Sequence, residues 1–255
     1  MGKYKQRRKS ASAAFYVPVA VLLIVFFVTI GTSVFLRILE IEVSGVEKYS
    51  EDDIISASGI NPGENMLLIN SGDVSRRIYA AMPYIKEIKV RFSLPDKVMI
   101  SVSETDAFAV LEHRGSFIVI DSACKILEVC DVAPKGLFEI RGYAPVDVKV
   151  GGQLSADASG ESRLRRLREI VAAVDKAGIS GGVSLIDITD LGNVYLVYED
   201  QFTVILGGSG AALSRLAKVP EAVLDAKADL SYDVANRYKT ELTDQSGTWL
   251  WTPEW

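Results

Sequence analysis

One stretch without charge constrains this chain more than any other feature. Between Lys9 and Arg37 the sequence runs for 27 residues without a charged side chain, and its most apolar part is 15–36. As a helix, these 22 residues would be about 33 Å long, which matches a bilayer hydrocarbon core of about 30 Å. The sequence therefore predicts a single transmembrane helix at 15–36.

Charge indicates on which side of the membrane the rest of the chain lies, because basic residues beside a first span stay in the cytoplasm. After the span, only Arg37 is basic before the acidic Glu40 and Glu42. The tail at 1–14 is strongly basic, through Lys3, Lys5, Arg7, Arg8 and Lys9. We expect this tail in the cytoplasm and the region from residue 38 outside. The alternative is a cleaved secretory signal, but its apolar region is about 7 to 15 residues long and ends in a small-x-small site, which this segment lacks.

The charge of the region outside the membrane limits what it can bind. The whole chain has 28 basic and 33 acidic residues, and its first 14 residues hold five of the basic ones and no acidic one. The remaining 23 basic and 33 acidic residues give a net charge of -10. An acidic region of this kind argues against a broad basic face for nucleic acid. Its length is sufficient for one or two domains with proper cores.

Cys124 and Cys130 are the only cysteines, and outside the cytoplasm they could form a disulfide. If residues 125–129 form a strand, the two Cα atoms lie about 20 Å apart, far beyond the limit of about 7 Å for a disulfide. No glycine or proline between them would permit a tight bend. We predict two packed thiols without a bridge.

The sequence offers little for catalysis. His113 is the only histidine, so neither a catalytic base nor a zinc site with the two cysteines is well supported. The run 207–210 resembles a nucleophile elbow only loosely, because Ala211 stands where that motif needs glycine. We therefore predict no catalytic residue, no metal and no cofactor. A membrane-anchored cell-wall enzyme remains a weak alternative.

The first region outside the membrane, 38–105, has the pattern of a small α+β domain. Leu39, Ile41 and Val43 alternate with polar residues as in a strand with one buried face. A short helix follows, with a capping-box-like start at Ser50 and a stop at Gly59. Asp73 is expected to cap a second helix, which ends before Pro83. Two more alternating segments, 88–92 and 98–102, form a hairpin and complete the order strand, helix, helix, strand, strand.

This order and its motifs resemble a known family. The segments IEVSGVEKYSEDDIISASGI, NMLLI and MPYIKEIKVRFSLPDKVMISVSE are similar to a POTRA domain that directly follows a membrane span. That combination resembles the bacterial cell-division family FtsQ, called DivIB in Gram-positive bacteria. The similarity includes VIDSACKILE, which matches an aspartate-then-turn hairpin at the start of the family's second domain. One departure is Thr105 to Ala109, where the family often has a Pro-Val-Ala-like stretch.

The second region, 106–242, is predicted to be mostly β, with two helices. The apolar stripe of the first helix includes Leu164, Leu167 and Ile170, and Gly178 ends it. The second runs from Leu213 to Leu224 and is bent or split near Pro220. The predicted strands are 108–112, 117–121, 126–129, 138–141, 183–189, 194–198 and 202–206. The basic cluster on the first helix, predicted to be its solvated face, comprises Arg163, Arg165, Arg166 and Arg168.

The resemblance also implies a binding site at the end of this domain. The segment 228–233 is similar to the family's late strand, and 237–242 would be the last strand. In the family, the partner FtsB, or its counterpart DivIC, adds a strand at this edge, which needs only an unpaired backbone ladder and a few pockets. Proline in such an edge removes no internal ladder bond. The implied partner-binding residues are Tyr232, Asp233, Arg237, Tyr238, Lys239, Thr240 and Leu242. The alternative is that they only keep an exposed edge soluble.

All three tryptophans lie in a C-terminal tail, 243–255. Tryptophan is common in binding hot spots, so Trp249 and Trp251 are further candidates for partner contact. Packing against the chain's own β domain and contact with the membrane are the other two interpretations.

Together these features predict a bitopic scaffold protein without catalysis. The resemblance implies that it joins FtsB/DivIC-like and FtsL-like proteins at the division septum, with the septal peptidoglycan synthase complex as a further partner, and helps regulate peptidoglycan synthesis. The main alternative is a POTRA module that handles exported polypeptides. Such proteins usually repeat the POTRA unit or add a transmembrane barrel, and neither is predicted from this sequence.

Overall fold

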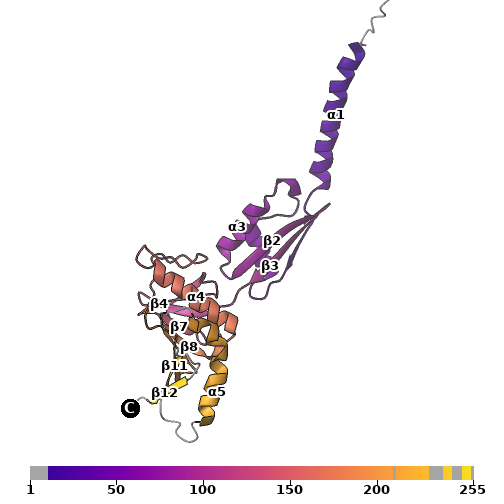
Figure 1. Ribbon diagram of the computed structural model, residues 1–255. Coiled ribbons are helices and arrows are strands. Elements are labelled where there is room, and N and C mark those ends of the chain that lie inside the picture. The colour runs from indigo at the N-terminus through magenta and orange to yellow at the C-terminus, as the bar shows by residue number, and fades with distance from the viewer. Residues whose placement is uncertain (1–10, 209–210, 230–237, 243–248, 254–255) are drawn as a thin grey trace, which may run out of the picture. The chain divides into compact units, whose positions relative to one another are not determined.

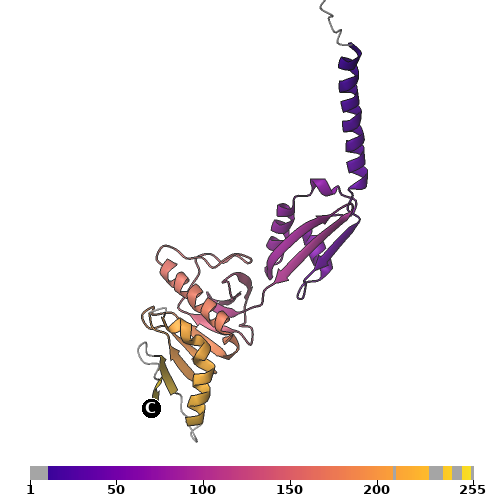
Figure 2. The same cartoon turned by 45° about the vertical axis from the view of Figure 1, so that its right-hand side comes forward.

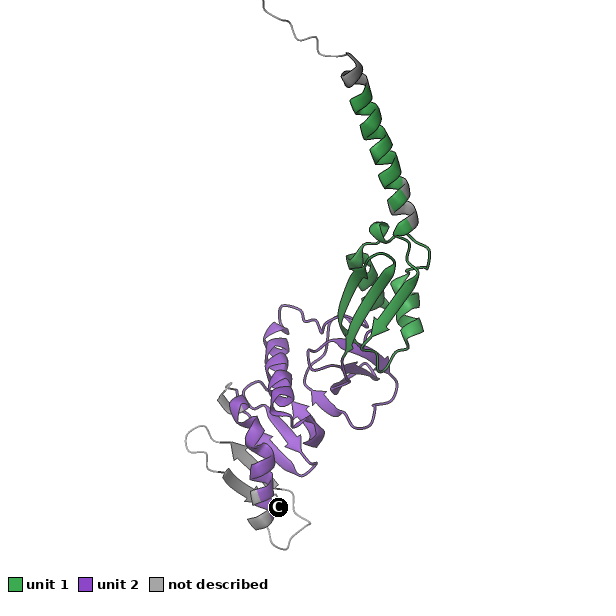
Figure 3. Ribbon diagram, turned by 90° about the vertical axis from the view of Figure 1, so that its right-hand side faces the viewer, with its two compact units in different colours: residues 1–81, 85–104 green, residues 82–84, 105–255 purple. Residues whose placement is uncertain are grey.

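A computed structural model describes residues 11–208, 211–229, 238–242 and 249–253 of the protein. The chain divides into two compact units, shown in different colours in Figure 3. Unit 1 comprises residues 1–81 and 85–104, and unit 2 comprises residues 82–84 and 105–255.

The N-terminal helix α1 spans Ala11–Phe35, so the predicted helix at 15–36 is present and begins four residues earlier. Every side chain from Tyr16 to Thr29 is exposed, although this stretch contains no charged residue. Among the residues whose side chains the structure describes, which in α1 are 16–29, 31 and 35, no helical segment has the length and the apolar character needed to cross a membrane.

The rest of unit 1 has the predicted order of strands and helices. Its three-stranded sheet has the order β1-β3-β2, in which β1 runs parallel to β3 and β2 antiparallel. Two helices lie against one face of the sheet, as Figure 2 shows, and bury Ile54, Val74 and Ile78 completely. The elements are β1 (Glu40–Ser44), α2 (Glu51–Ser58), the 3-10 helix η1 (Met66–Leu68), α3 (Ser71–Ala81), β2 (Ile85–Ser93) and β3 (Lys97–Glu104).

The predicted limits of α2 are confirmed. The Ser50 hydroxyl accepts a hydrogen bond from the Asp53 N–H, and the Asp53 side chain accepts one from the Ser50 N–H, which completes a capping box. Gly59 ends the helix in the left-handed conformation. The predicted cap of α3 is wrong. Asp73 lies inside the first turn, because Asn70 already accepts a hydrogen bond from the Gly72 N–H at 2.9 Å.

The predicted core position of Leu39 is also wrong, since its side chain is 71% exposed. Ile38 is fully buried instead, and its N–H donates to the Glu64 carbonyl at 2.9 Å. The alternation that the sequence suggested therefore begins only at Glu40, where pairing with β3 starts.

Unit 2 contains a nine-stranded sheet with the order β12-β11-β10-β9-β8-β7-β4-β5-β6. All seven strands predicted between 108 and 206 are present. The pairs β4–β7, β7–β8 and β10–β11 are parallel and the rest antiparallel. The strands are β4 (Ala109–His113), β5 (Ser116–Ile120), β6 (Ile126–Cys130), β7 (Phe138–Arg141), β8 (Val183–Asp187), β9 (Tyr195–Tyr198), β10 (Phe202–Ile205), β11 (Tyr238–Leu242) and β12 (Trp249–Pro253).

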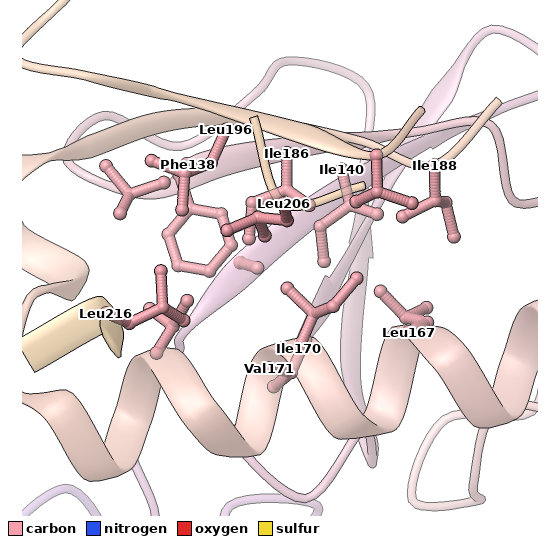
Figure 4. Packing of buried hydrophobic residues seen from close by; sticks show 14 of the residues in the cluster. Phe138, Ile140, Leu167, Ile170, Val171, Ile186, Ile188, Leu196, Leu206 and Leu216 are labelled. Carbon is pink, nitrogen blue, oxygen red and sulfur yellow. The ribbon is translucent and has the colours of Figure 1, made fainter. Parts of the chain in front are cut away.

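The core of unit 2 forms where α4 (Glu161–Ala177) packs on the sheet (Figure 1). In Figure 4, Leu167, Ile170 and Val171 of α4 point toward Phe138 and Ile186 of the sheet. All five side chains are at least 98% buried, as their place in a helical stripe and on alternating strand positions requires. The predicted end of α4 at Gly178 is confirmed.

The second predicted helix is split, as the sequence suggested. A 3-10 helix, η3 (Ala211–Lys218), is followed by α5 (Val219–Asp229). Pro220 is the second residue of α5, where a missing backbone N–H costs nothing, so proline is compatible with a new helix start. A further short 3-10 helix, η2 (Ser180–Gly182), leads into β8.

Candidate partner-binding edge

The C-terminal end of the sheet in unit 2 contains one more strand than predicted. β11 pairs with β10 on one side and with β12 on the other. The prediction that 237–242 is the last strand is therefore wrong, and β12 forms the outer edge. Thr240, for example, lies opposite Val204 of β10 and opposite Trp251 of β12. The backbone of β11 is thus engaged on both sides.

The helix α5 leads the chain from β10 toward β11. A parallel pair needs such a crossover, because the chain must return to the same end of the sheet. Lys227 of α5 forms an ion pair with Glu199 in the turn before β10, and its ammonium nitrogen lies 5.7 Å from the centre of the Phe202 ring. Val223 and Ala226 of α5 belong to the buried core. These contacts hold the crossover beside the first residues of β10.

The opposite edge of the same sheet is partly covered. The N–H of Ile126, at the start of β6, donates to the Gly152 carbonyl at 2.8 Å, and the Gly151 N–H donates to the Ile126 carbonyl at 2.8 Å. Lys125 forms an isolated bridge with Gln153. A loop that covers a strand in this way blocks addition of another strand. Of the two edges, β12 is therefore the one without such a loop in the described part of the chain.

The structure places the predicted binding residues in three groups. Tyr232, Asp233 and Arg237 lie outside the described residues. The others predicted from the late strand all lie in β11, namely Tyr238, Lys239, Thr240 and Leu242. Trp249 and Trp251 lie in β12, opposite Leu242 and Thr240 respectively. Pairing of β12 with the chain's own sheet agrees with one of the three interpretations of the tail.

Sequence analysis missed β12 although a signal for it exists. The run WLWTP at 249–253 combines aromatic and β-branched residues, which favour strands. The sequence analysis places this run in the C-terminal tail, 243–255, instead. A proline at its last position does not oppose a strand at the edge of a sheet.

The basic cluster on α4 is only in part the solvated face that the sequence predicted, since Arg165 and Arg168 are exposed, Arg163 is half-buried and Arg166 is buried. Arg166 is 8% exposed, and its Nη2 donates to the Gly207 carbonyl at 3.1 Å. Arg163 and Arg168 donate to the carbonyls of Thr189 and Leu154, at 3.2 Å and 3.1 Å. Only Arg165 of the four is exposed without a carbonyl contact of this kind among the hydrogen bonds of the described residues. Three arginines thus tie α4 to neighbouring loops.

A pocket of about 300 Å³ lies at the N-terminal end of α4. Asp157 lines it and accepts hydrogen bonds from the Ser159 hydroxyl and the Gly160 N–H, which lower the pKa of the Asp157 carboxyl. The carboxylate therefore stabilises the turn that leads into α4. The residues that line the pocket include neither histidine nor cysteine, so a nucleophile such as Ser162 has no imidazole base beside it.

The cysteines are free, as predicted. Cys124 lies in a turn just before β6 and is buried, which raises the pKa of its thiol to about 11. Cys130, at the other end of β6, is only partly buried. A buried thiol with a raised pKa is a poor nucleophile. Among the described residues, no group of three His, Cys, Asp or Glu side chains is arranged to hold a metal ion.

Comparison with known proteins shows what this chain is similar to. Residues 36–105 match the family model described as "POTRA domain, FtsQ-type". The cell division protein DivIB of Clostridium tetani is 25% identical over 174 residues, which are 68% of this chain and 64% of that protein. The cell division protein FtsQ of Streptomyces bingchenggensis is 26% identical over 206 residues, 80% of this chain and 74% of that protein. Residues 36–105 therefore resemble a POTRA domain of the FtsQ type, and the longer matches are to FtsQ and DivIB cell division proteins.

The chain spans a little under two thirds of the C. tetani relative. Its matched POTRA segment begins one residue after α1 and ends one residue after β3. A solved structure of the extracytoplasmic domain of DivIB from Geobacillus stearothermophilus matches 51% of this chain and 99% of that chain, with 15% sequence identity and a TM-score of 0.33.

Proposed function

We propose that this chain is an FtsQ/DivIB-type protein, a bitopic scaffold protein of bacterial cell division. It is anchored in the cell membrane by one helix, binds FtsB/DivIC-like and FtsL-like proteins outside the membrane at the septum, and helps regulate septal peptidoglycan synthesis without catalysis of its own. The relatives that support this proposal are named cell division proteins. The observation that carries it is the sheet edge formed by β12, which lies beside β11.

The proposed anchor is α1. Its side chains from Tyr16 to Thr29 are exposed on every side, with Leu22 70% and Phe27 67% exposed. A helix that is apolar all round and has no protein packed against it is stable only where water is absent. Its 25 residues correspond to a length of about 37 Å, sufficient for a bilayer core of about 30 Å.

The proposed partner site is the outer side of β12. An extended partner segment that adds there gains backbone hydrogen bonds along the strand and breaks no pairing that the sheet already has. β11, with Tyr238 to Leu242, then supports β12 from behind, and Trp249 and Trp251 belong to the strand that the partner contacts. This site requires neither a cofactor nor a catalytic group.

The test of the partner site is a deletion. The full chain in detergent or nanodiscs is compared with a variant that ends at residue 248 and with a control that ends at residue 253, which keeps β12. Binding of an FtsB/DivIC-like ectodomain should be lost in the first variant and normal in the control. Increased binding to the first variant would mean that the partner replaces β12 on β11. Unchanged binding would place the partner elsewhere.

The test of the anchor is protease access in intact, wall-stripped cells. External protease should digest the region from 38 onward and spare the N-terminal tail, because α1 separates the two. Protection of that region would overturn the proposed orientation. A mature N-terminus near residue 34 would establish a cleaved signal instead.

A further inference from the structure

The exposed apolar side chains of unit 1 are unevenly distributed. Over residues 36–104, all of which are described, the exposed large apolar residues are Leu39, Leu67, Leu68, Tyr79, Phe92 and Leu94. All except Tyr79 lie at the end of the small domain where the chain leaves α1. We call these five residues the apolar rim. Leu39, Leu67, Leu68 and Leu94 are 71%, 62%, 84% and 68% exposed, and Phe92 is 37% exposed.

Backbone hydrogen bonds bring the three segments of the rim together. The Leu39 N–H donates to the Asp96 carbonyl at 2.8 Å, which joins the start of β1 to the tip of the β2–β3 hairpin that carries Leu94. The Met66 N–H donates to the Leu36 carbonyl at 2.9 Å, which joins η1 to the residue after α1. Phe92 lies opposite Val98, at the hairpin end of β2.

The rim is held in place from within. Met66 is 3% exposed and Ile38 is fully buried, so Leu67 and Leu39 each follow a residue that is anchored in the core. The Asn65 side chain accepts a hydrogen bond from the Leu67 N–H at 2.9 Å, and the Asn65 carbonyl accepts one from the Leu68 N–H at 3.0 Å. The turn that presents Leu67 and Leu68 is therefore well formed, and the two side chains point away from the domain although they are apolar.

We propose that the apolar rim inserts into the interfacial layer of the bilayer, so that the small domain of unit 1 is seated on the membrane surface. This inference rests on the proposed anchor. Leu39 is four residues from Phe35, the last residue of α1, so the two Cα atoms are at most about 14 Å apart. If α1 crosses the bilayer, the rim lies at its surface, where exposed leucine and phenylalanine side chains insert to a depth of about 5–10 Å.

The charges around the rim favour apolar insertion over attraction to anionic lipid. Glu40, Glu64 and Asp96 lie in the same segments as the rim, and Lys97 is paired with Glu40 and Glu42. Arg37 is the only basic residue among 36–40. Insertion should therefore occur in bilayers of phosphatidylcholine alone and should persist when salt screens charge interactions. A partner protein that covers the rim is the other class of occupant.

Site-directed spin labels on the full chain in phosphatidylcholine nanodiscs test whether the apolar rim inserts into the bilayer. Cys124→Ala and Cys130→Ser remove the native thiols, and single cysteines are placed at Leu39, Leu68 and Leu94. Phe26 in α1 is the control for the anchor. Val132, an apolar residue of unit 2 that is 77% exposed, is the control for a water-exposed site. The measurement is the accessibility of each label to oxygen relative to a water-soluble nickel complex, which rises with depth in the bilayer.

The expected ratio at Leu39, Leu68 and Leu94 exceeds that at Val132 by at least about threefold, as for side chains at the acyl boundary. Ratios equal to that at Val132, with a high ratio at Phe26, would overturn the seating while the anchor stands. A low ratio at Phe26 would overturn the anchor itself. In a second variant, Leu67→Ser, Leu68→Ser and Leu94→Ser together should abolish the high ratio at Leu39 without change in circular dichroism. Persistence of that ratio would show that the rim does not hold the domain on the bilayer.

Discussion

Arg166 connects two segments that are far apart in the sequence. Its guanidinium reaches the Gly207 carbonyl after β10 and the Glu169 carboxylate one turn along α4, the latter at 3.3 Å. A buried carbonyl that loses its donor retains the cost of desolvation, which makes such contacts sensitive to mutation. The sequence could not indicate which arginine of the cluster is buried, because all four are spaced along one helix and only the position of the Gly207 turn distinguishes them.

We predict that Arg166→Ala lowers the free energy of unfolding of unit 2 by about 1–3 kcal/mol. Arg165→Ala is the matched control, since Arg165 is exposed on the same helix, and it should change stability by less than about 0.5 kcal/mol. Urea denaturation of both variants measures the difference. Equal effects of the two substitutions would contradict the assigned role of Arg166.

The buried Cys124 thiol should make the stability of the folded chain depend on pH. Burial raises its pKa from the usual 9.0 to about 11, so the folded chain keeps a proton that the unfolded chain releases above pH 9. The free energy of unfolding is therefore unaffected by ionisation of Cys124 below pH 9 and falls as the pH rises from 9 to about 11. The total decrease is on the order of 2 kcal/mol. Cys124→Ala should lack this part of the pH dependence. Iodoacetamide at pH 8 should modify Cys130 first, and early modification of Cys124 would contradict its burial.

Among the elements, the turn between β1 and α2 depends on glycine. Gly45 has a φ of +82°, and a Cβ there would lie 2.1 Å from the Val102 carbonyl oxygen of β3. Gly63 has a similar φ of +89° but open space around it. Both positions carry the same backbone cost for alanine, of about 1–2 kcal/mol, whereas only Gly45 also carries a steric clash.

Gly45→Ala should therefore destabilise unit 1 more than Gly63→Ala, by an additional amount of about 1–3 kcal/mol for the displacement of β1 from β3. Thermal and urea denaturation of the two variants provide the comparison. If both substitutions cost the same, the close approach of Gly45 to Val102 does not limit the fold.

The pairing of β11 on both sides can be tested with proline substitutions. The N–H groups of successive residues in a strand point to opposite sides, so prolines at Lys239 and Thr240 would each remove a donor from a different neighbour. Because β11 is paired on both sides, each substitution should lower the stability of unit 2, by about 1 kcal/mol or more. This reverses our expectation for an edge strand. Normal urea denaturation of both variants would show that β11 is not paired as described.

Local sequence patterns predicted most helices and strands, but few of the pairings between strands. Short strand-forming runs separated by turns predicted all seven strands between 108 and 206, and the capping box at Ser50 predicted the start of α2, because these signals depend on residues close in the chain. The parallel pairing of β11 with β10 and the antiparallel pairing with β12 depend on contacts across the sheet, which no local pattern contains. The edge of the candidate site was misplaced for that reason.

At the scale of the whole molecule, each unit has its own buried core. Ile78 of α3 and Ile186 of β8 are both fully buried, one in each unit. Ile78→Ala should destabilise unit 1 by about 2–5 kcal/mol and leave the transition of unit 2 unchanged, and Ile186→Ala should do the reverse. Hydrogen exchange followed by mass spectrometry reports on both units in one sample. Loss of protection in both units from either substitution would show that they unfold together.

The parallel pair β10–β11 has a consequence for synthesis of the chain. β10 ends at Ile205, and its partner begins only at Tyr238, so the ribosome must add more than thirty residues before that ladder can close. Ladders between strands so far apart in sequence form late, because a long loop must be closed first. A nascent chain that stops anywhere in this interval leaves β10 paired with β9 on one side and open on the other, and such an open edge is a template for aggregation. Chaperones that bind extended segments during export should therefore protect this part of the chain longest.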